Sequence, residues 1–359
     1  MSVVYKKLED VCEILDSRRV PITAKDRKAG AFPYYGANGL QDYVADYIFD
    51  DELVLLAEDG GNFGSKERPI AYRVSGKCWV NNHAHVLKAK PNMHVDYLCY
   101  ALMFYDTEGL VNGATRQKLT QAAMRQMVIP YRDMTEQLQI IEKISQIVRA
   151  IEKRKEELQL LDQLVKSRFI ELFGDPLIED DRYPRVPLGS LAEVGSSKRI
   201  FEKEYVSEGI PFYRTKEIVE LSKGNRITTE LFITKERYDQ IRSEYGAPQK
   251  GDLLISAVGT IGVIWIVDGK NNFYFKDGNL LRVSATEKFV PEYLKHLLEA
   301  LISAYKSEMS SGTAYAALTI SALKEMMVYD VPHAEQEQFA AFVEQTDKSK
   351  LCGKMEVAA

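Results

Sequence analysis

The sequence predicts a mixed α/β fold, in which two similar α+β domains are separated by a long coiled-coil-forming helix and a short second helix lies at the C-terminus. Three observations predict it: a block of sequence that occurs twice, a long segment between the copies without proline or glycine, and a hydrophobic content of 45%, which suffices for buried cores. We expect domains at residues 1–133 and 182–333, the long helix at 134–175, and the short helix with a tail at 334–359.

The duplicated block supports the two domains. Residues 113–146 align with residues 312–345 at an offset of 199 residues (312 minus 113), and nine of 34 positions are identical without a gap. The identical pairs are Gly113/Gly312, Leu119/Leu318, Thr120/Thr319, Ala123/Ala322, Met127/Met326, Glu136/Glu335, Gln137/Gln336, Gln139/Gln338 and Gln146/Gln345. Self-similarity over so long a period indicates a duplicated structural unit.

Shorter landmarks earlier in each copy recur in the same order, while their offset drifts. They pair Lys7-Leu8 through Glu13-Ile14 with Pro187-Leu188 through Glu193-Val194, Pro33-Tyr34-Tyr35 with Pro211-Phe212-Tyr213, Leu55-Leu56 with Leu253-Leu254, Gly61 and Gly64 with Gly259 and Gly262, and Tyr97-Leu98 with Tyr293-Leu294. This is the pattern of one domain copied with different loops. Both copies have short Val/Ile/Tyr/Phe runs typical of strands, and helices are expected at Val95–Tyr105 and Pro291–Ser307.

The segment between the copies predicts the long helix. Thr135 is a plausible N-cap, and Gly174-Asp175-Pro176 is a helix stop. Apolar positions alternate in steps of four and three, interrupted only by Arg154 and Arg168; they are Ile140, Ile144, Ile147, Ile151, Leu158, Leu161, Val165 and Leu172. Such a heptad seam packs along another helix. At ~1.5 Å per residue the helix is about 58 Å long. A long core helix of a single globular domain is the alternative.

Composition narrows the class of protein. A net charge of -5 counts against a simple DNA-binding protein, although Arg18–Lys28 and Gly109–Arg132 are locally basic. Those basic stretches could be solvated faces or DNA contacts. The four cysteines are widely spaced, as free thiols in a reducing cytoplasm would be. Since the N-terminus has no signal-peptide pattern and no apolar run is long enough to span a bilayer, we expect a cytoplasmic protein without membrane contact.

Several segments, weak singly but found together and in duplicate, match a known family. They are Leu318-Thr319 through Pro332 with Glu335-Gln336, the degenerate copy Leu119-Thr120 through Glu136-Gln137, Gly251–Ile255 followed by Gly259–Gly262, and Lys166–Phe169 through Phe173-Gly174-Asp175. On these segments the chain resembles the specificity subunits of type I restriction-modification systems, over all but about its last dozen residues.

The resemblance implies partners and a division of labour. Each repeat would be a target-recognition domain that reads one half of a bipartite site in double-stranded DNA, and the two helices would pair antiparallel as a spacer. Adenine-methylating (methyltransferase) subunits would dock on this chain, and a restriction subunit with motor and endonuclease activity would join them. The chain itself would need no cofactor and have no catalytic residues. The second helix departs from the family because we expect it to end at about Lys350, which leaves open a truncated gene copy or self-association through the spacer helix.

Polar loops on each domain are candidate DNA-reading segments, because Arg, Asn and Gln hydrogen-bond base edges while Lys, Ser and Thr bind phosphates. In the first domain the candidates are Ser17, Arg18, Arg19, Tyr34, Tyr35, Asn38, Gly60, Gly61, Asn62, Asn81, Asn82, Thr115, Arg116, Gln117 and Lys118. In the second domain they are Ser196, Ser197, Lys198, Arg199, Tyr213, Arg214, Thr215, Lys216, Ser256, Gly259, Thr260, Lys276, Asn279, Thr313 and Tyr315. The alternative is that glycine and asparagine merely form turns there.

Catalytic motifs are not evident in the sequence. We find no phosphate-binding glycine loop and no Asn-Pro-Pro-Tyr-type motif for adenine methylation. His83 and His85, with Cys78 and His94 nearby in sequence, form a weak candidate for a metal site, because structural zinc needs four well-spaced ligands; we therefore expect no metal. Two other functions remain open, namely a restriction-modification enzyme fragment with an unrecognised catalytic site and a plain coiled-coil scaffold.

Overall fold

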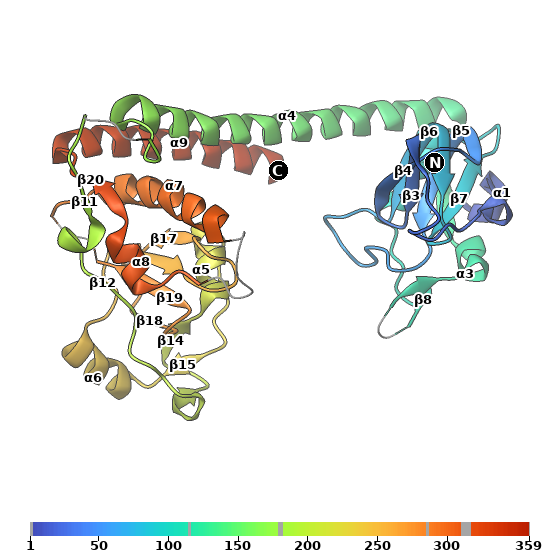
Figure 1. Cartoon of the computed structure of the whole chain (residues 1–359). Helices are drawn as coiled ribbons and strands as arrows, with labels where there is room; N and C mark the ends of the chain where they lie inside the picture. Colours follow the sequence, from blue (N-terminus) through green and yellow to red (C-terminus); the bar gives the residue numbers. More distant parts are fainter. Residues whose placement is uncertain (1–2, 114–115, 179–181, 285–286, 310–316, 359) are drawn as a thin grey trace. The chain divides into compact units, whose positions relative to one another are not determined.

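The computed structural model describes residues 3–113, 116–178, 182–284, 287–309 and 317–358 (Figure 1). The chain divides into two compact units, Met1–Glu152 and Lys153–Ala359, and each is described by itself. Among the described residues, none of the helices has both the length and the apolar character that crossing a membrane requires.

The first unit is built around a six-stranded sheet with strand order β2-β7-β5-β6-β3-β4. Its elements are β1 (Val4–Lys7), α1 (Leu8–Val11), β2 (Cys12–Ile14), η1 (Asp16–Arg18), β3 (Ala29–Gly36), β4 (Gly39–Val44), β5 (Phe49–Ala57), β6 (Ala71–Val80), β7 (Ala84–Ala89), α2 (Val95–Met103), β8 (Val111–Asn112), β9 (Lys118–Leu119), α3 (Gln121–Gln126) and β10 (Val128–Tyr131). Strand β5 lies between two cores: Leu53 and Leu55 pack into one, and Val54 and Leu56 into the other. Its continuous apolar run is what a strand covered on both faces needs.

The second unit contains two four-stranded sheets, with orders β12-β19-β16-β17 and β13-β15-β14-β18. Its elements are β11 (Arg185–Pro187), η2 (Leu188–Ser190), β12 (Val194–Gly195), η3 (Glu202–Glu204), β13 (Tyr205–Val206), β14 (Ile210–Tyr213), α5 (Thr215–Ser222), β15 (Phe232–Ile233), α6 (Lys235–Tyr245), β16 (Leu253–Ser256), β17 (Ile264–Ile266), β18 (Tyr274–Phe275), β19 (Leu280–Val283), α7 (Pro291–Met309), α8 (Ile320–Glu325) and β20 (Met327–Tyr329). Strand β16 is the counterpart of β5, since Leu253 and Ile255 enter one core and Leu254 enters another.

The long helix α4 runs without a break from Met134 to Phe173. Its start differs from the prediction that Thr135 is the N-cap. The Asp133 carboxylate accepts a hydrogen bond from the backbone N–H of Glu136 at 2.9 Å, so the cap lies two residues earlier than predicted. The predicted seam follows the less exposed side of α4, with Ile147, 59% exposed, as the exception. The helix ends at Phe173, and the next residue, Gly174, has a φ of +87°, which suits glycine.

Within the second unit, α4 packs against α9 (His333–Ala358). The rings of Phe169 and Phe339 lie 5.3 Å apart, and Lys350 Nζ is 2.8 Å from an Asp162 carboxylate oxygen. Earlier residues of one helix therefore meet later residues of the other, and the pairing is antiparallel, as Figure 1 also shows. The prediction that α9 ends at about Lys350 is wrong, because the helix continues to Ala358. A single interior glycine weakens a helix by only about 1 kcal/mol, and Gly353 is not followed by proline.

The duplication is repeated at the level of individual hydrogen bonds. The buried Gln137 side chain accepts from the backbone N–H of His94 and donates to the carbonyls of Asn92 and Arg132. Gln336 makes the same three bonds in the second unit, to the N–H of Val290 and the carbonyls of Lys288 and Val331. In both units the glutamine ties the start of the helix that follows the last strand, α4 or α9, to the segment before α2 or α7.

The segment just before that helix is also equivalent. Thr120 caps α3 by accepting from the N–H of Ala123, and Thr319 caps α8 through Ala322. Isolated bridges pair Asp59 with Lys118 and Val258 with Ala317, each pair 199 residues from its counterpart (258 minus 59, 317 minus 118). This register shifts two predicted landmarks by one residue: Gly259 aligns with Gly60 rather than with Gly61, and Leu254-Ile255 aligns with Leu55-Leu56. Both of these glycines have positive φ, +64° at Gly60 and +74° at Gly259, which other residues adopt only with strain.

Candidate nucleic-acid interface

Several loops of the first unit that are distant in sequence meet one another. The Asn38 side chain, in the β3–β4 turn, donates to the Gly60 carbonyl at 3.0 Å, and the Gly60 N–H donates to the Gln117 carbonyl at 3.1 Å. The N–H of Glu58 donates to the His83 carbonyl, so the loop between β6 and β7 joins the same cluster. The predicted polar segments around residues 38, 60, 83 and 117 therefore form one surface, which we call the first loop cluster.

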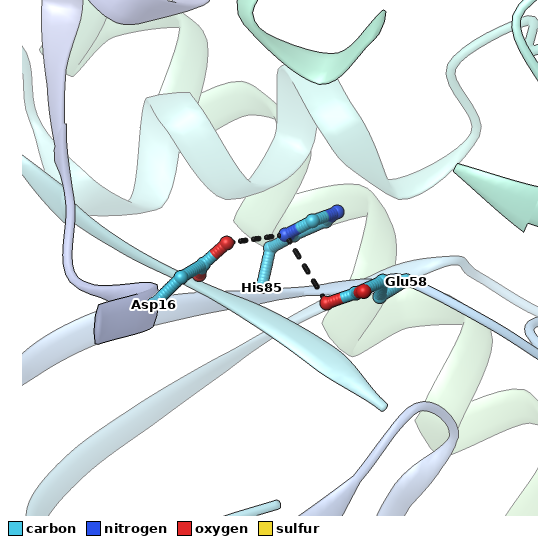
Figure 2. Close-up of side chains that lie close together, drawn as sticks. All are labelled: Asp16, Glu58 and His85. Carbon is cyan, nitrogen blue, oxygen red and sulfur yellow. Dashed lines mark hydrogen bonds and ion pairs between the residues drawn. The ribbon is translucent and has the colours of Figure 1, made fainter. Parts of the chain in front are cut away.

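A buried ionic network lies beneath the first loop cluster (Figure 2). His85 Nδ1 lies 2.6 Å from Asp16 Oδ2, and its Nε2 lies 2.9 Å from the Leu119 carbonyl oxygen. Both neighbours are hydrogen-bond acceptors, so each ring nitrogen faces an oxygen to which an N–H can donate. Arg19 donates to Glu58 Oε2 at 2.7 Å and to the Ala84 carbonyl at 2.8 Å. The network fixes the loop after β2 against the loop after β5.

The two carboxylates of this network are held ionised. Burial disfavours the charged form of Asp16, but hydrogen bonds from His85, the Val86 N–H and Gln121 outweigh it and lower the pKa of this carboxyl below its usual 3.8. Burial also opposes ionisation of Glu58, and hydrogen bonds from Arg19 and Lys118 likewise lower its pKa.

Asp16, Glu58 and His85 are also the described residues whose ligand atoms could surround a metal ion, lying within 4.8 Å of one another. Their partners argue for an ionic network instead, because Arg19 and Lys118 already supply positive charge and a metal ion would have to displace them. The weak candidate site around the two histidines is not assembled: Cys78 packs in the core beside Leu53, and His94 caps α2 by accepting from the N–H of Asp96.

The exposed part of the first loop cluster carries charged and amide side chains. Arg18, Asn38, Asn82, Arg116 and Gln117 are exposed, as are Ser17 and Lys118. Tyr34 and Asn81 are only 1% and 3% exposed, and Asn81 donates to Gln41, so their burial assigns them to the scaffold of the loops rather than to a DNA contact. Gly60 is also exposed, whereas Arg19, Tyr35, Gly61 and Asn62 are half-buried, and Thr115 lies outside the described residues.

The second unit forms a comparable second loop cluster. Ser196 donates to the Leu280 carbonyl at 3.0 Å, Ser197 donates to the Phe275 carbonyl at 2.7 Å, and Arg199 pairs with Asp277 at 2.8 Å. The Ala257 N–H donates to the Asn279 carbonyl, and the N–H of Lys276 donates to the Tyr213 carbonyl. The predicted segments around 196, 257 and 276 thus meet, as their counterparts do in the first unit.

Within this second loop cluster the predicted residues divide in the same way. Lys198, Arg199, Lys216, Gly259, Thr260 and Asn279 are exposed. Tyr213 and Ser256 are 6% and 0% exposed and belong to the scaffold, where Tyr213 stacks on Phe273 and Ser256 accepts from the N–H of Val263. Arg214 pairs with the buried Glu217, next to Thr215 at the start of α5. Thr313 and Tyr315 lie outside the described residues.

The buried ionic network is not a requirement of the shared fold. Strand pairing aligns Ile14 and Leu87 with Val194 and Val283, and the N–H bonds to His83 and Asn279 align Glu58 with Ala257. The positions of Asp16, Glu58 and His85 are therefore taken in the second unit by the uncharged Ser196, Ala257 and Leu281. The same scaffold carries different chemistry at the same place in its two copies.

Some residues that shape the site were not predicted. Asp16 and His85 were missed as partners because they lie 69 residues apart, and only the pairing of β2 with β7 brings them together. The alternation of His83 and His85 on either side of the first residue of β7 was the available signal, although it points to carboxylate partners rather than to a metal.

Comparison with known proteins identifies the family. Residues 2–161 and 182–353 match the model of the family described as the type I restriction modification DNA specificity domain. The chain belongs to this family. The resemblance inferred from the sequence is therefore confirmed, as is the fold of two similar mixed α/β domains with a long and a short helix; the domain boundaries at 133, 175 and 182 stay a prediction.

Relatives of the specificity family are similar to this chain, in sequence or in fold, over nearly its whole length. The putative type I restriction enzyme specificity subunit S.HindORF215P of Haemophilus influenzae is 31% identical over 348 residues, which cover 95% of this chain and 87% of that protein. The fold is similar to that of the S subunit from M. genitalium, with a TM-score of 0.55 at 14% identity over 100% of this chain and 92% of that one. A chain from a structure of the assembly and conformational transition of the type I R-M system gives 0.58 at 16% identity, covering 100% and 94%.

Proposed function

We propose that this chain is the sequence-specific DNA-binding subunit of a type I restriction-modification complex, and that each unit reads one half of a bipartite site in double-stranded DNA. The observation that carries the proposal is the duplication: one scaffold is built twice, down to the bonds of Gln137 and Gln336, while its loop clusters differ. Two half-sites of different sequence require this combination of a constant frame and variable contact residues.

The exposed groups of both loop clusters suit DNA. Arg18, Arg116 and Lys118 in the first unit, and Lys198 and Arg199 in the second, are exposed cations that can bind phosphates or guanine. Exposed Asn38 and Asn279 can pair with adenine edges. The net charge of -5 for the whole chain implies that part of the phosphate contact comes from partner subunits.

We propose further that the chain does no chemistry itself but directs methyltransferase subunits and a restriction subunit to the site, in the cytoplasm where chromosomal DNA lies. The carboxylates of the buried network support this division, because Asp16 and Glu58 are engaged by His85, Arg19 and Lys118 and are not poised as free bases. The resemblance drawn from the sequence implies the same division of labour.

The helix α4 would set the distance between the two half-sites. It is continuous over 40 residues, so a change in its length changes the separation of whatever its ends hold. Inserting four residues between Arg149 and Gln159 should therefore change the number of unread bases between half-sites; an unchanged spacing would contradict this role.

The test is to co-express the chain with the methyltransferase subunit of its own genome and to map methylated adenines. We expect one bipartite motif that is present only with this chain. Exchanging residues 182–333 for those of a relative should alter one half of the motif alone. A complex that forms without producing any motif, or an exchange that alters both halves, would overturn the proposal.

A further inference from the structure

The exposed edge of the first loop cluster contains an arginine that is held in place by an aspartate and a histidine. Arg116 Nη2 lies 2.8 Å from Asp59 Oδ1, and His83 Nδ1 lies 2.5 Å from the same oxygen. The three residues come from three separate segments: the loop after β5, the loop before β7 and the segment before β9. The position of the guanidinium is therefore set by contacts with Asp59 and His83 and not only by the arginine side chain's own conformation.

The orientation of this group leaves donors for a ligand. The side chain of Arg116 is 60% exposed, whereas Asp59 is 18% and His83 35% exposed. Among the described residues, Arg116 contacts Asp59 and His83 through Nη2, so that Nη1, Nε and the second N–H of Nη2 remain as donors on the accessible side. Gly60 lies beside the guanidinium, since a Cβ there would be in ordinary van der Waals contact with Arg116 Nε, at 3.4 Å.

We infer that Arg116, positioned by Asp59 and His83, recognises a guanine in the half-site read by the first unit; this rests on the proposed function. Guanine presents two acceptors, O6 and N7, to the major groove, and the planar guanidinium matches them with two parallel N–H donors. Adenine places an amino donor where guanine has O6, so it would be rejected. Because Asp59 already fixes the orientation of the guanidinium, less side-chain conformational entropy is lost on binding than for an unrestrained arginine.

The second unit supports a role in specificity rather than in general DNA affinity. The positions of Asp59 and His83 are occupied there by Val258 and Asn279, as the bridge to Ala317 and the bond to Ala257 show. A contact needed for binding any DNA backbone would be expected in both copies. A contact that reads one base is expected to differ between the units, because the two half-sites differ.

The experiment maps methylated adenines for the full chain co-expressed with its methyltransferase subunit, comparing wild type, Arg116→Ala, Arg116→Lys and Asp59→Asn. We expect R116A to relax one guanine position of the first half-site, lowering discrimination there by roughly 5- to 150-fold. R116K should relax the same position, because lysine keeps the charge but lacks the planar pair of parallel N–H donors. D59N should relax that position too, to a smaller degree. Arg125→Ala, which removes an equally charged side chain on α3 that pairs with Glu9, is the matched control and should leave the motif unchanged.

Three results would overturn the inference while leaving the proposed function standing. The first is a motif that R116A leaves as strict as wild type. The second is an R116A chain that loses methylation evenly at all sites while R116K restores it, which would mean a phosphate contact. The third is a D59N chain that relaxes a different base from R116A. If the wild-type chain yields no motif, the proposed function falls and the inference falls with it.

Discussion

Replacing the buried glutamine at the start of α4 or of α9 tests whether equivalent hydrogen bonds stabilise the two copies. Gln137→Leu and Gln336→Leu each remove three hydrogen bonds to the backbone, at a position that is 0% exposed. With a net contribution of about 1 kcal/mol per bond, we expect each unit to lose roughly 3 kcal/mol of unfolding free energy. Buried N–H and C=O groups left without a partner would add to that loss.

The chain offers a separate optical probe for each unit. Of its two tryptophans, Trp79 lies in β6 of the first unit and Trp265 in β17 of the second. Urea unfolding followed by fluorescence therefore reports the first unit in a Trp265→Phe background and the second in a Trp79→Phe background. The Gln137 variant should destabilise the first unit and spare the second, and the Gln336 variant should do the reverse.

A matched control comes from the same repeat. Gln146 and Gln345 are another identical pair, but both are exposed, so Q146L and Q345L should change the free energy of unfolding by no more than about 0.5 kcal/mol. The reasoning would be refuted if either buried variant lost less than about 1 kcal/mol, or if the controls lost as much as the buried variants.

Further predictions concern the buried network, a crowded glycine and the cysteines. The pKa values of Asp16 and Glu58 are lowered by folding, so the stability that these groups contribute is complete above their ordinary values of 3.8 and 4.5 and is lost as the pH falls through the lowered values. Urea unfolding of the first unit over an acidic pH series should show that loss, and Asp16→Asn should reduce it. Gly61→Ala should destabilise the first unit by roughly 1–3 kcal/mol, since the new Cβ would lie 2.4 Å from the Cβ of Ala57, and a value near zero in the same assay would contradict the packing. The thiols of Cys12, Cys78 and Cys99 should resist alkylation until the protein unfolds, because burial raises their pKa to about 12, 11 and 12, respectively. Mass spectrometry of labelled native protein would detect any that react.

The duplicated fold could be predicted because its supporting residues recur at a fixed spacing. Gln137 and Gln336, and the capping Thr120 and Thr319, are identical and lie 199 residues apart, and they make the same bonds. The long helix could be predicted because its apolar period and stop signal are local features. The residues by which its C-terminal end contacts the core were less well predicted. The seam position there is Leu172, but the buried residues are Phe169 and Phe173, which pack among other aromatic rings.

The candidate site could be predicted only at the level of loops. Composition identified the polar segments that form both clusters, but it did not distinguish the buried Asn81 from the exposed Asn82 beside it. That difference is set by the bond between Asn81 and Gln41, which lie 40 residues apart, and such tertiary contacts have no local signal. The same reason explains why Arg19, next to the exposed Arg18, is tied to Glu58 instead of being available to a ligand.

The antiparallel pairing of the first and last strands in each unit bears on how these genes change. Strand β1 pairs with β10, and β11 with β20, so the segment from β1 to β10 and the segment from β11 to β20 each begin and end at neighbouring positions. Two crossovers in the DNA, one on each side of the sequence that encodes such a segment, would exchange a complete globular domain without dividing a sheet. We therefore expect recombination to replace half of a specificity in one step, producing a new combination of old parts, whereas point changes would alter it one base at a time.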